Sequence, residues 1–130
     1  MDNKDNAKFS VRERLKSFKY AFNGLKVLFK EEHNARIHMI IAILAIIAGF
    51  LLDISAGEWL TVCILIGLIF SMEIINSAIE TICDFISPDW HASIKKIKDL
   101  MAAAVLITAI ISVICGIIIF GPKLFNLIFA

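Results

Sequence analysis

Three long apolar stretches, separated by short polar ones, dominate the pattern of this chain. They cover residues 35–52, 58–86 and 97–121, and each is long enough to cross the hydrocarbon core of a bilayer as a helix. The middle stretch is longer than a span needs, so we expect its carboxyl-terminal end to project toward the lipid headgroups. The pattern predicts a single domain over residues 1–130 that crosses the membrane three times.

Residues 9–32, before the first span, follow a different pattern. Apolar side chains recur there at steps of three and four residues, and basic side chains fill much of the remainder. This pattern predicts an amphipathic basic helix that lies on an anionic membrane surface. The alternative is an ordinary soluble helix that packs against another protein.

The distribution of charge gives the spans a direction. Of the 13 Lys and Arg residues, nine lie at or before Arg36, and three more lie in the connection and the entrance to the third span. Since basic residues collect on the cytoplasmic side, we expect a cytoplasmic amino terminus, an outer carboxyl terminus and a location in the cell membrane. The same distribution argues against a nucleic-acid-binding face. Pro122 is expected to end the third helix.

Composition supports the membrane assignment. Hydrophobic residues make up 59% of the chain and its mean hydropathy is +0.84, which is too apolar for a soluble globular domain. The three cysteines lie in apolar runs without CxxC spacing, as is typical of packing residues rather than zinc ligands or disulfides.

A polar stripe runs along the end of the second span, in the sequence SMEIINSAIETICDFI of residues 71–86. At about 100° per residue, its polar side chains fall within one sector of a helix. They are Glu73, Asn76, Ser77, Glu80 and Asp84. A carboxylate at membrane depth is costly unless it faces a partner, a cation or water. Three acids on one stripe also repel one another, which a multivalent cation would relieve.

The oxygen ligands of the stripe suit Mg²⁺ better than zinc, and proteins commonly hold Mg²⁺ with one or two carboxylates together with nucleotide phosphates. Glu73 and Glu80 are about 10 Å apart along a helix axis, so they cannot act on the same atom. The deeper Glu73 would be free to act as a base on a hydroxyl at headgroup depth. Purely structural polar contacts between helices explain the same spacing, and both interpretations stay open at this point.

The stripe also resembles a known signature. The segment EIINSAIE, from Glu73 to Glu80 and followed by Asp84, is similar to that of the prokaryotic diacylglycerol kinase family of small three-span membrane lipid kinases. Equivalent residues occur along nearly the whole chain: Lys16, Tyr20, Glu32, Arg36, His91, Lys98 and Asp99. The resemblance implies an all-α integral membrane protein with a surface helix and three transmembrane helices. It also implies a homotrimer whose active sites are shared between neighbouring subunits.

The family pattern, carried over residue by residue, implies a role for each matching position. Glu73 would be the catalytic base, and Glu32 and Glu80 would be the Mg²⁺ ligands. The nucleotide, ATP as co-substrate, would be bound by Lys16, Tyr20, Glu32, Glu80, Asp84, Asp89, Trp90, His91, Lys98 and Asp99. Asn76, Glu73 and Arg36 would bind the lipid substrate or support the site. His33 and His38 are assigned no role.

The chain departs from the family pattern at two places. Glu13, flanked by Arg12 and Arg14, stands where some members have a basic residue near the nucleotide. Leu100-Met101-Ala102 replaces a small Gly-Ser pair. Three segments resemble the Gram-positive branch: residues 34–38, the Ser87-Pro88 turn and the extension with Gly121-Pro122-Lys123. This resemblance implies that undecaprenol is the lipid phosphorylated; diacylglycerol, giving phosphatidic acid, is the alternative.

Two other classes of function compete with a kinase. A small ion or drug transporter would use the stripe as a proton or cation path, although no polar chain continues through residues 60–70. A membrane assembly protein without catalytic activity would use the stripe only to hold helices together.

Overall fold

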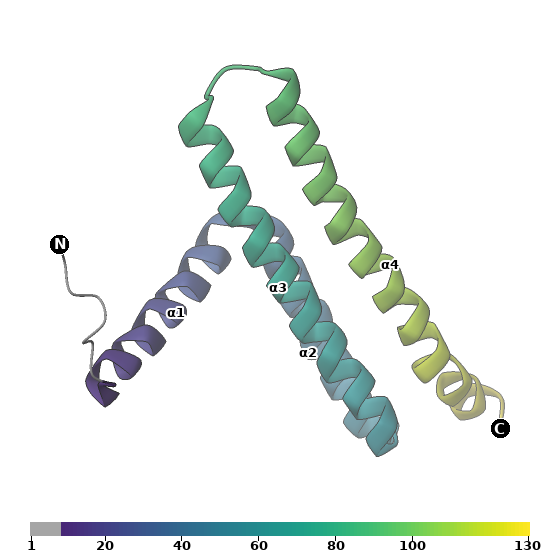
Figure 1. Ribbon diagram of the computed structural model, residues 1–130. Helices are drawn as coiled ribbons and strands as arrows, with labels where there is room; N and C mark the ends of the chain where they lie inside the picture. The colour runs from purple at the N-terminus through teal and green to yellow at the C-terminus, as the bar shows by residue number, and fades with distance from the viewer. Residues whose placement is uncertain (1–8) are drawn as a thin grey trace.

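The computed structural model describes residues 9–130, and that part of the chain is helical apart from short connections (Figure 1). Its helices, in order, are α1 (Val11–Glu31), α2 (His33–Leu51), α3 (Ala56–Ile86) and α4 (Ala92–Phe129). Three of them, α2, α3 and α4, are long and apolar enough to cross a membrane. The predicted all-α architecture with three spans is therefore confirmed; α2 and α3 begin and end within two residues of the predicted bounds, and α4 is longer than predicted at both ends.

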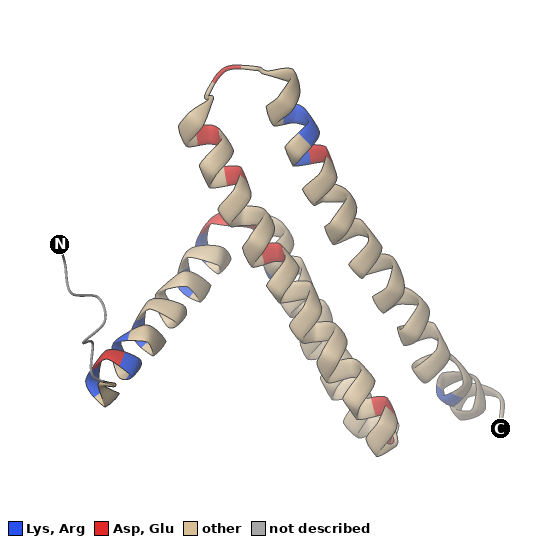
Figure 2. Ribbon diagram, viewed as in Figure 1, with Lys and Arg blue, Asp and Glu red and all other residues tan. Residues whose placement is uncertain are grey.

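Helix α1 stands away from the others (Figure 1). Ser10 caps its start by accepting a hydrogen bond from the backbone N–H of Glu13, and the chain turns sharply at Glu32 into α2. The apolar side chains of Leu15, Phe18 and Phe22 are largely exposed. An uncovered apolar stripe next to the Lys and Arg residues of α1 (Figure 2) is what a helix on a membrane surface requires.

The elbow between α1 and α2 is fixed by polar and apolar contacts. The guanidinium of Arg36 donates to the backbone carbonyl of Phe29 at 2.7 Å and to that of Lys30, which satisfies carbonyl groups left free at the end of α1. The ring of Phe29 packs edge-on against Phe70 of α3, with centroids 5.7 Å apart. Leu28 and Ala35 are fully buried here. The elbow thus rests against the middle of α3.

Helices α2 and α3 form a hairpin with a tight connection at the end remote from the elbow. Asp53 adopts a left-handed conformation, with φ of 49°, and Ser55 and Glu58 form a reciprocal capping box at the start of α3. Gly49 allows the indole of Trp59 to lie directly against the α2 backbone, beside the ring of Phe50. The packing at this point depends on the missing side chain of Gly49.

Helix α4 returns along the hairpin and closes a small apolar core at the same end. This core contains the buried residues Ile54, Val62 and Ile119. An ion pair between Lys123 and Glu58, 3.7 Å apart, joins the end of α4 to the start of α3.

The expectation that Pro122 ends the third helix is wrong, because α4 continues to Phe129. Proline fits helical φ and removes only one backbone donor. Transmembrane helices tolerate that loss where neighbouring groups compensate.

Helix α3 is long enough to place one end outside the hydrocarbon layer. Its 31 residues extend over about 46 Å, against roughly 30 Å for the apolar core of a bilayer. Acidic residues occupy the half of α3 that leads into the α3–α4 connection, and Lys residues begin α4 beside it (Figure 2). Many large apolar side chains elsewhere on α2, α3 and α4 are exposed, as expected where helices face lipid or other subunits.

Gly49→Ala is expected to destabilise the protein by about 1–3 kcal/mol, as overpacking of a tight contact does. The added Cβ would lie 2.6 Å from Cη2 of Trp59, and the ring cannot move freely because Phe50 packs against it. Thermal unfolding in detergent measures the effect. Gly57→Ala is the matched control, because nothing lies within 4 Å of a Cβ at that position. Equal melting temperatures for both variants would contradict the proposed contact.

Candidate active site

Glu73 is the most deeply buried charged residue of residues 9–130, with 1% of its surface exposed. It faces α2, where Nε2 of His38 lies 3.3 Å from its Oε1. This pair is close enough for an electrostatic contact but is not aligned as a hydrogen bond, and within the described chain no other group donates to Oε1. The Glu73 carboxylate is thus enclosed by protein, but its Oε1 accepts no hydrogen bond from residues 9–130.

Glu32 and Ser77 connect the elbow to the polar stripe. The hydroxyl of Ser77 on α3 donates to Oε1 of Glu32 at 3.1 Å, across 45 residues of sequence. Glu80 lies one turn further along α3, on the same face as Ser77. The structure therefore brings the two predicted metal ligands, Glu32 and Glu80, to the same part of the surface.

This donor set fits Mg²⁺ only when other ligands complete it. Within residues 9–130, no three His, Cys, Asp or Glu side chains are grouped closely enough to hold a metal by themselves. Mg²⁺ in nucleotide sites characteristically takes one or two carboxylates and fills its remaining positions with phosphate oxygens and water. Two half-buried carboxylates, one of them oriented by a hydroxyl, match that requirement.

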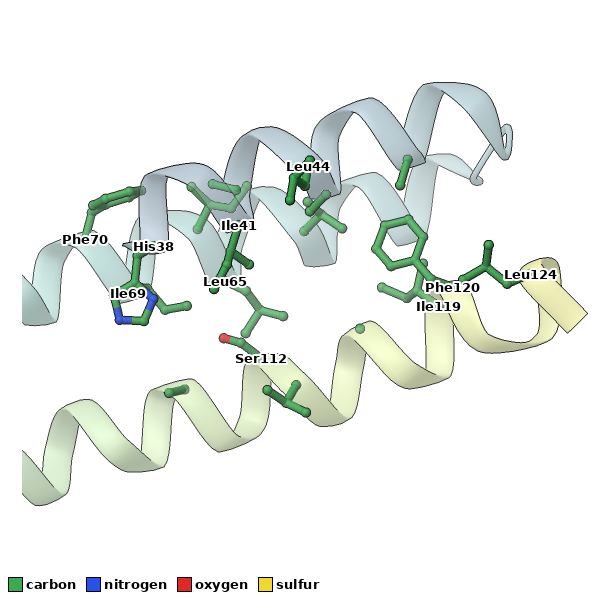
Figure 3. A pocket seen from close by; sticks show the side chains of 18 residues that line it. His38, Ile41, Leu44, Leu65, Ile69, Phe70, Ser112, Ile119, Phe120 and Leu124 are labelled. Carbon is green, nitrogen blue, oxygen red and sulfur yellow. The ribbon is translucent and has the colours of Figure 1, made fainter. Parts of the chain in front are cut away.

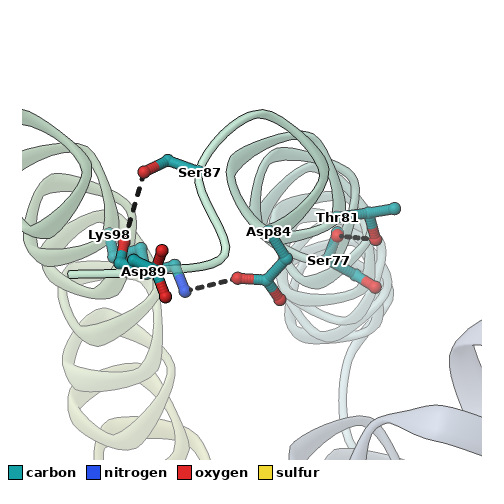
Figure 4. Close-up of polar contacts among 6 residues, drawn as sticks. All are labelled: Ser77, Thr81, Asp84, Ser87, Asp89 and Lys98. Carbon is teal, nitrogen blue, oxygen red and sulfur yellow. Dashed lines mark hydrogen bonds and ion pairs between the residues drawn. The ribbon is translucent and has the colours of Figure 1, made fainter. Parts of the chain in front are cut away.

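A second group of predicted residues gathers at the α3–α4 connection, around a cavity of about 280 Å³. Six predicted nucleotide-binding residues line it: Asp84, Asp89, Trp90, His91, Lys98 and Asp99. Nζ of Lys98 lies 2.8 Å from Oδ1 of Asp84 and so joins α4 to α3 (Figure 4). Nδ1 of His91 accepts from the backbone N–H of Ser93 and caps α4. The cavity combines both charge signs with an exposed indole.

Other predicted site residues are not brought to this cavity within one chain. Lys16 and Tyr20 are exposed on α1, whose amino-terminal half lies far from the α3–α4 connection (Figure 1). Arg36 is engaged at the elbow with backbone carbonyls. Asn76 lies half-buried on α3 between Glu73 and Glu80.

Two residues that contact the predicted acids were not expected to belong to the site. Ser77 lies on the stripe but has no role predicted from the sequence, and His38 has none either. A histidine within an apolar span is uncommon and usually has a polar partner, so the position of His38 was a sequence signal for such a contact. Its partner became evident only when α2 and α3 were placed side by side.

Residues 19–120 match the family model described as "Prokaryotic diacylglycerol kinase". The chain belongs to this family. It is 40% identical to the undecaprenol kinase of Bacillus subtilis over 124 residues, which are 95% of this chain and 100% of that protein. It is 32% identical to the diacylglycerol kinase of Escherichia coli K12 over 100 residues, which are 77% of this chain and 82% of that protein.

A further relative is the diacylglycerol kinase of Haemophilus influenzae, 32% identical over 82% of this chain and 91% of that protein. The prediction of a membrane lipid kinase, with a nucleotide and a lipid as substrates, is thereby confirmed. The similarity to the Bacillus subtilis protein supports the predicted branch. The transporter and assembly-protein alternatives gain no support from these relatives.

Trp90 is expected to respond when this kinase binds nucleotide, because its indole is 79% exposed and lines the α3–α4 cavity. In a Trp59→Phe variant, which leaves Trp90 as the single tryptophan, adding ATP with Mg²⁺ should change the intensity or position of the fluorescence emission. The control is Trp90→Phe, whose remaining Trp59 packs at the other end of the molecule and should not respond. An equal response of both variants would contradict a nucleotide site at this cavity.

Proposed function

We propose that this kinase transfers the γ-phosphoryl group of ATP to the terminal hydroxyl of undecaprenol and so produces undecaprenyl phosphate. The observation that carries the proposal is the arrangement of acids on α3. A buried carboxylate, Glu73, lies at membrane depth, and about two turns further the stripe continues to Glu80 near the elbow. The full-length similarity to an undecaprenol kinase supports this choice of lipid.

Glu73 is proposed as the catalytic base. A lipid alcohol diffuses within the bilayer, so its hydroxyl reaches the protein laterally, at the depth where Glu73 is buried. The carboxylate accepts the hydroxyl proton as the oxygen attacks the γ-phosphorus, and the bond from that phosphorus to the β–γ bridging oxygen breaks. The products are a lipid phosphate and ADP, and the proton remains on Glu73 until the site opens.

Glu32 and Glu80 are proposed to hold Mg²⁺ together with the phosphates of ATP. When bound, the metal neutralises charge on the phosphates. Ser77 keeps the Glu32 carboxylate turned toward α3. Lys98 is near enough to the stripe, through Asp84, to change partners and contact phosphate. Lys16, Tyr20, Asp89, Trp90, His91 and Asp99 complete the proposed nucleotide contacts, and Asn76 and Arg36 support the site.

A homotrimer with shared sites is part of the proposal. In one chain the predicted nucleotide residues lie in three places: a group on α1, Glu32 and Glu80 beside the elbow, and a group at the α3–α4 connection. A neighbouring subunit could bring the α1 group of one chain to the cavity of the next. The many exposed apolar side chains of α2, α3 and α4 leave enough surface for such packing. We place the amino terminus in the cytoplasm and the carboxyl terminus outside, as the basic residues indicate.

The proposal is tested with purified protein in detergent micelles, labelled ATP and Mg²⁺. Undecaprenol and diacylglycerol are offered in parallel at equal mole fraction. We expect faster phosphorylation of undecaprenol, measured as kcat/KM for each lipid. A higher kcat/KM for diacylglycerol would replace the proposed lipid with the alternative, and transfer to neither would overturn the proposal.

Glu73→Gln is expected to lower kcat by at least about 100-fold, because the amide keeps the shape of the side chain but cannot accept the proton. The melting temperature and the oligomer mass in detergent should stay those of the unmodified protein. Glu58→Gln, at the opposite end of the same helix, is the matched control and should keep full activity. Turnover retained by Glu73→Gln would exclude it as the base.

A further inference from the structure

An apolar cavity of about 510 Å³ lies between α2, α3 and α4 (Figure 3). Its lining contains two polar side chains, those of His38 and Ser112. The hydroxyl of Ser112 donates to the backbone carbonyl of Thr108 within its own helix. His38 is therefore the one polar side chain of this lining whose hydrogen-bonding capacity is not used within its own helix.

His38 also occupies the boundary between this cavity and the buried acid. In Figure 3 it lies near Ile69 and Phe70 at one end of the cavity, remote from Phe120 and Leu124. Its Nε2 is 3.3 Å from Oε1 of Glu73, which itself is not part of the lining. The imidazole thus stands between the apolar space and the carboxylate, with 18% of its side chain exposed.

Oε1 of Glu73 needs a donor. A buried acceptor that makes no hydrogen bond costs about 1–3 kcal/mol, and more when it is charged. Among residues 9–130, no group meets hydrogen-bond geometry with this atom, and Nε2 of His38 is the one Lys, Arg or His nitrogen that lies in ion-pair range of it. The separation of 3.3 Å between Nε2 and Oε1 is close to hydrogen-bond length, so the orientation of the imidazole is what keeps the bond from forming.

We propose that His38 is a positioning residue for the phosphoryl transfer: its Nε2–H holds Oε1 of Glu73, so that the other carboxylate oxygen is directed at the lipid hydroxyl. This inference rests on the proposed role of Glu73 as base. It assigns His38 no contact with nucleotide and no proton transfer of its own. The consequence is that replacing His38 changes kcat without changing the binding of ATP.

The first test compares two variants of the full-length protein. In His38→Leu the donor is lost, and we expect kcat to fall on the order of 10- to 100-fold, as small misplacements of a catalytic group do. In His38→Gln the amide nitrogen reaches the position of Nε2, and we expect most of the kcat to return. The KM for ATP should stay within about twofold of the unmodified value in both, because a residue that only orients Glu73 contributes nothing to ATP binding. His33→Leu is the matched control, since His33 is exposed at the start of α2.

The second test does not depend on activity. With ¹⁵N-labelled histidine, the imidazole resonances of His38 are assigned by their loss in His38→Gln and compared between the unmodified protein and Glu73→Gln. We expect the Nε2 resonance of His38 to move and those of His33 to stay in place. An unmoved resonance, or equal kcat losses in the Leu and Gln variants at equal melting temperature, would overturn the role of His38.

The two proposals fail in different ways. If Glu73→Gln keeps its turnover, the proposed base is wrong whatever the histidine variants show. If Glu73→Gln is inactive and His38→Leu keeps its full kcat, the base is supported and the positioning role of His38 is refuted.

Discussion

The fold keeps carboxylates at membrane depth, and this requirement explains how its helices are arranged. A charged side chain in a lipid environment is tolerated only when it faces protein, water or a cation. Glu73 meets this requirement by facing α2, where His38 is its neighbour. The elbow at Glu32 places α2 and the end of α1 against the middle of α3. Ser77, on the same stripe as Glu73, donates a hydrogen bond to Glu32.

Two different kinds of packing hold this arrangement. At one end of the hairpin, apolar contacts decide the geometry: Gly49 admits the ring of Trp59, and Ile54, Val62 and Ile119 form a small core. At the other end, α3 and α4 are linked by the polar contact between Asp84 and Lys98. Exposed ion pairs contribute little to stability, typically below about 1 kcal/mol. The polar end is therefore held more weakly than the apolar end and can rearrange around a ligand.

This asymmetry suits a lipid kinase. The reaction needs a rigid position for the group that takes the hydroxyl proton and an adaptable one for the nucleotide phosphates. Glu73, the proposed base, belongs to the buried part of α3, whereas the cavity of Asp84, Trp90 and Lys98, the proposed nucleotide site, belongs to the loosely linked part. Helix α3 can contribute to both parts because it is longer than the apolar layer of the bilayer and extends beyond it by several turns.

The helices, the three spans and the polar stripe could be predicted from the sequence, because they depend on local periodicity and on length relative to the bilayer. The sequence also led to Glu32, Glu73 and Glu80 as site residues, through their spacing and the family signature. Only the tertiary structure paired His38 with Glu73 and Ser77 with Glu32, because these contacts join residues 35 and 45 positions apart that no periodicity relates. The fold likewise continues α4 through Pro122, which the sequence pattern did not predict, because proline fits helical φ and removes one backbone donor only.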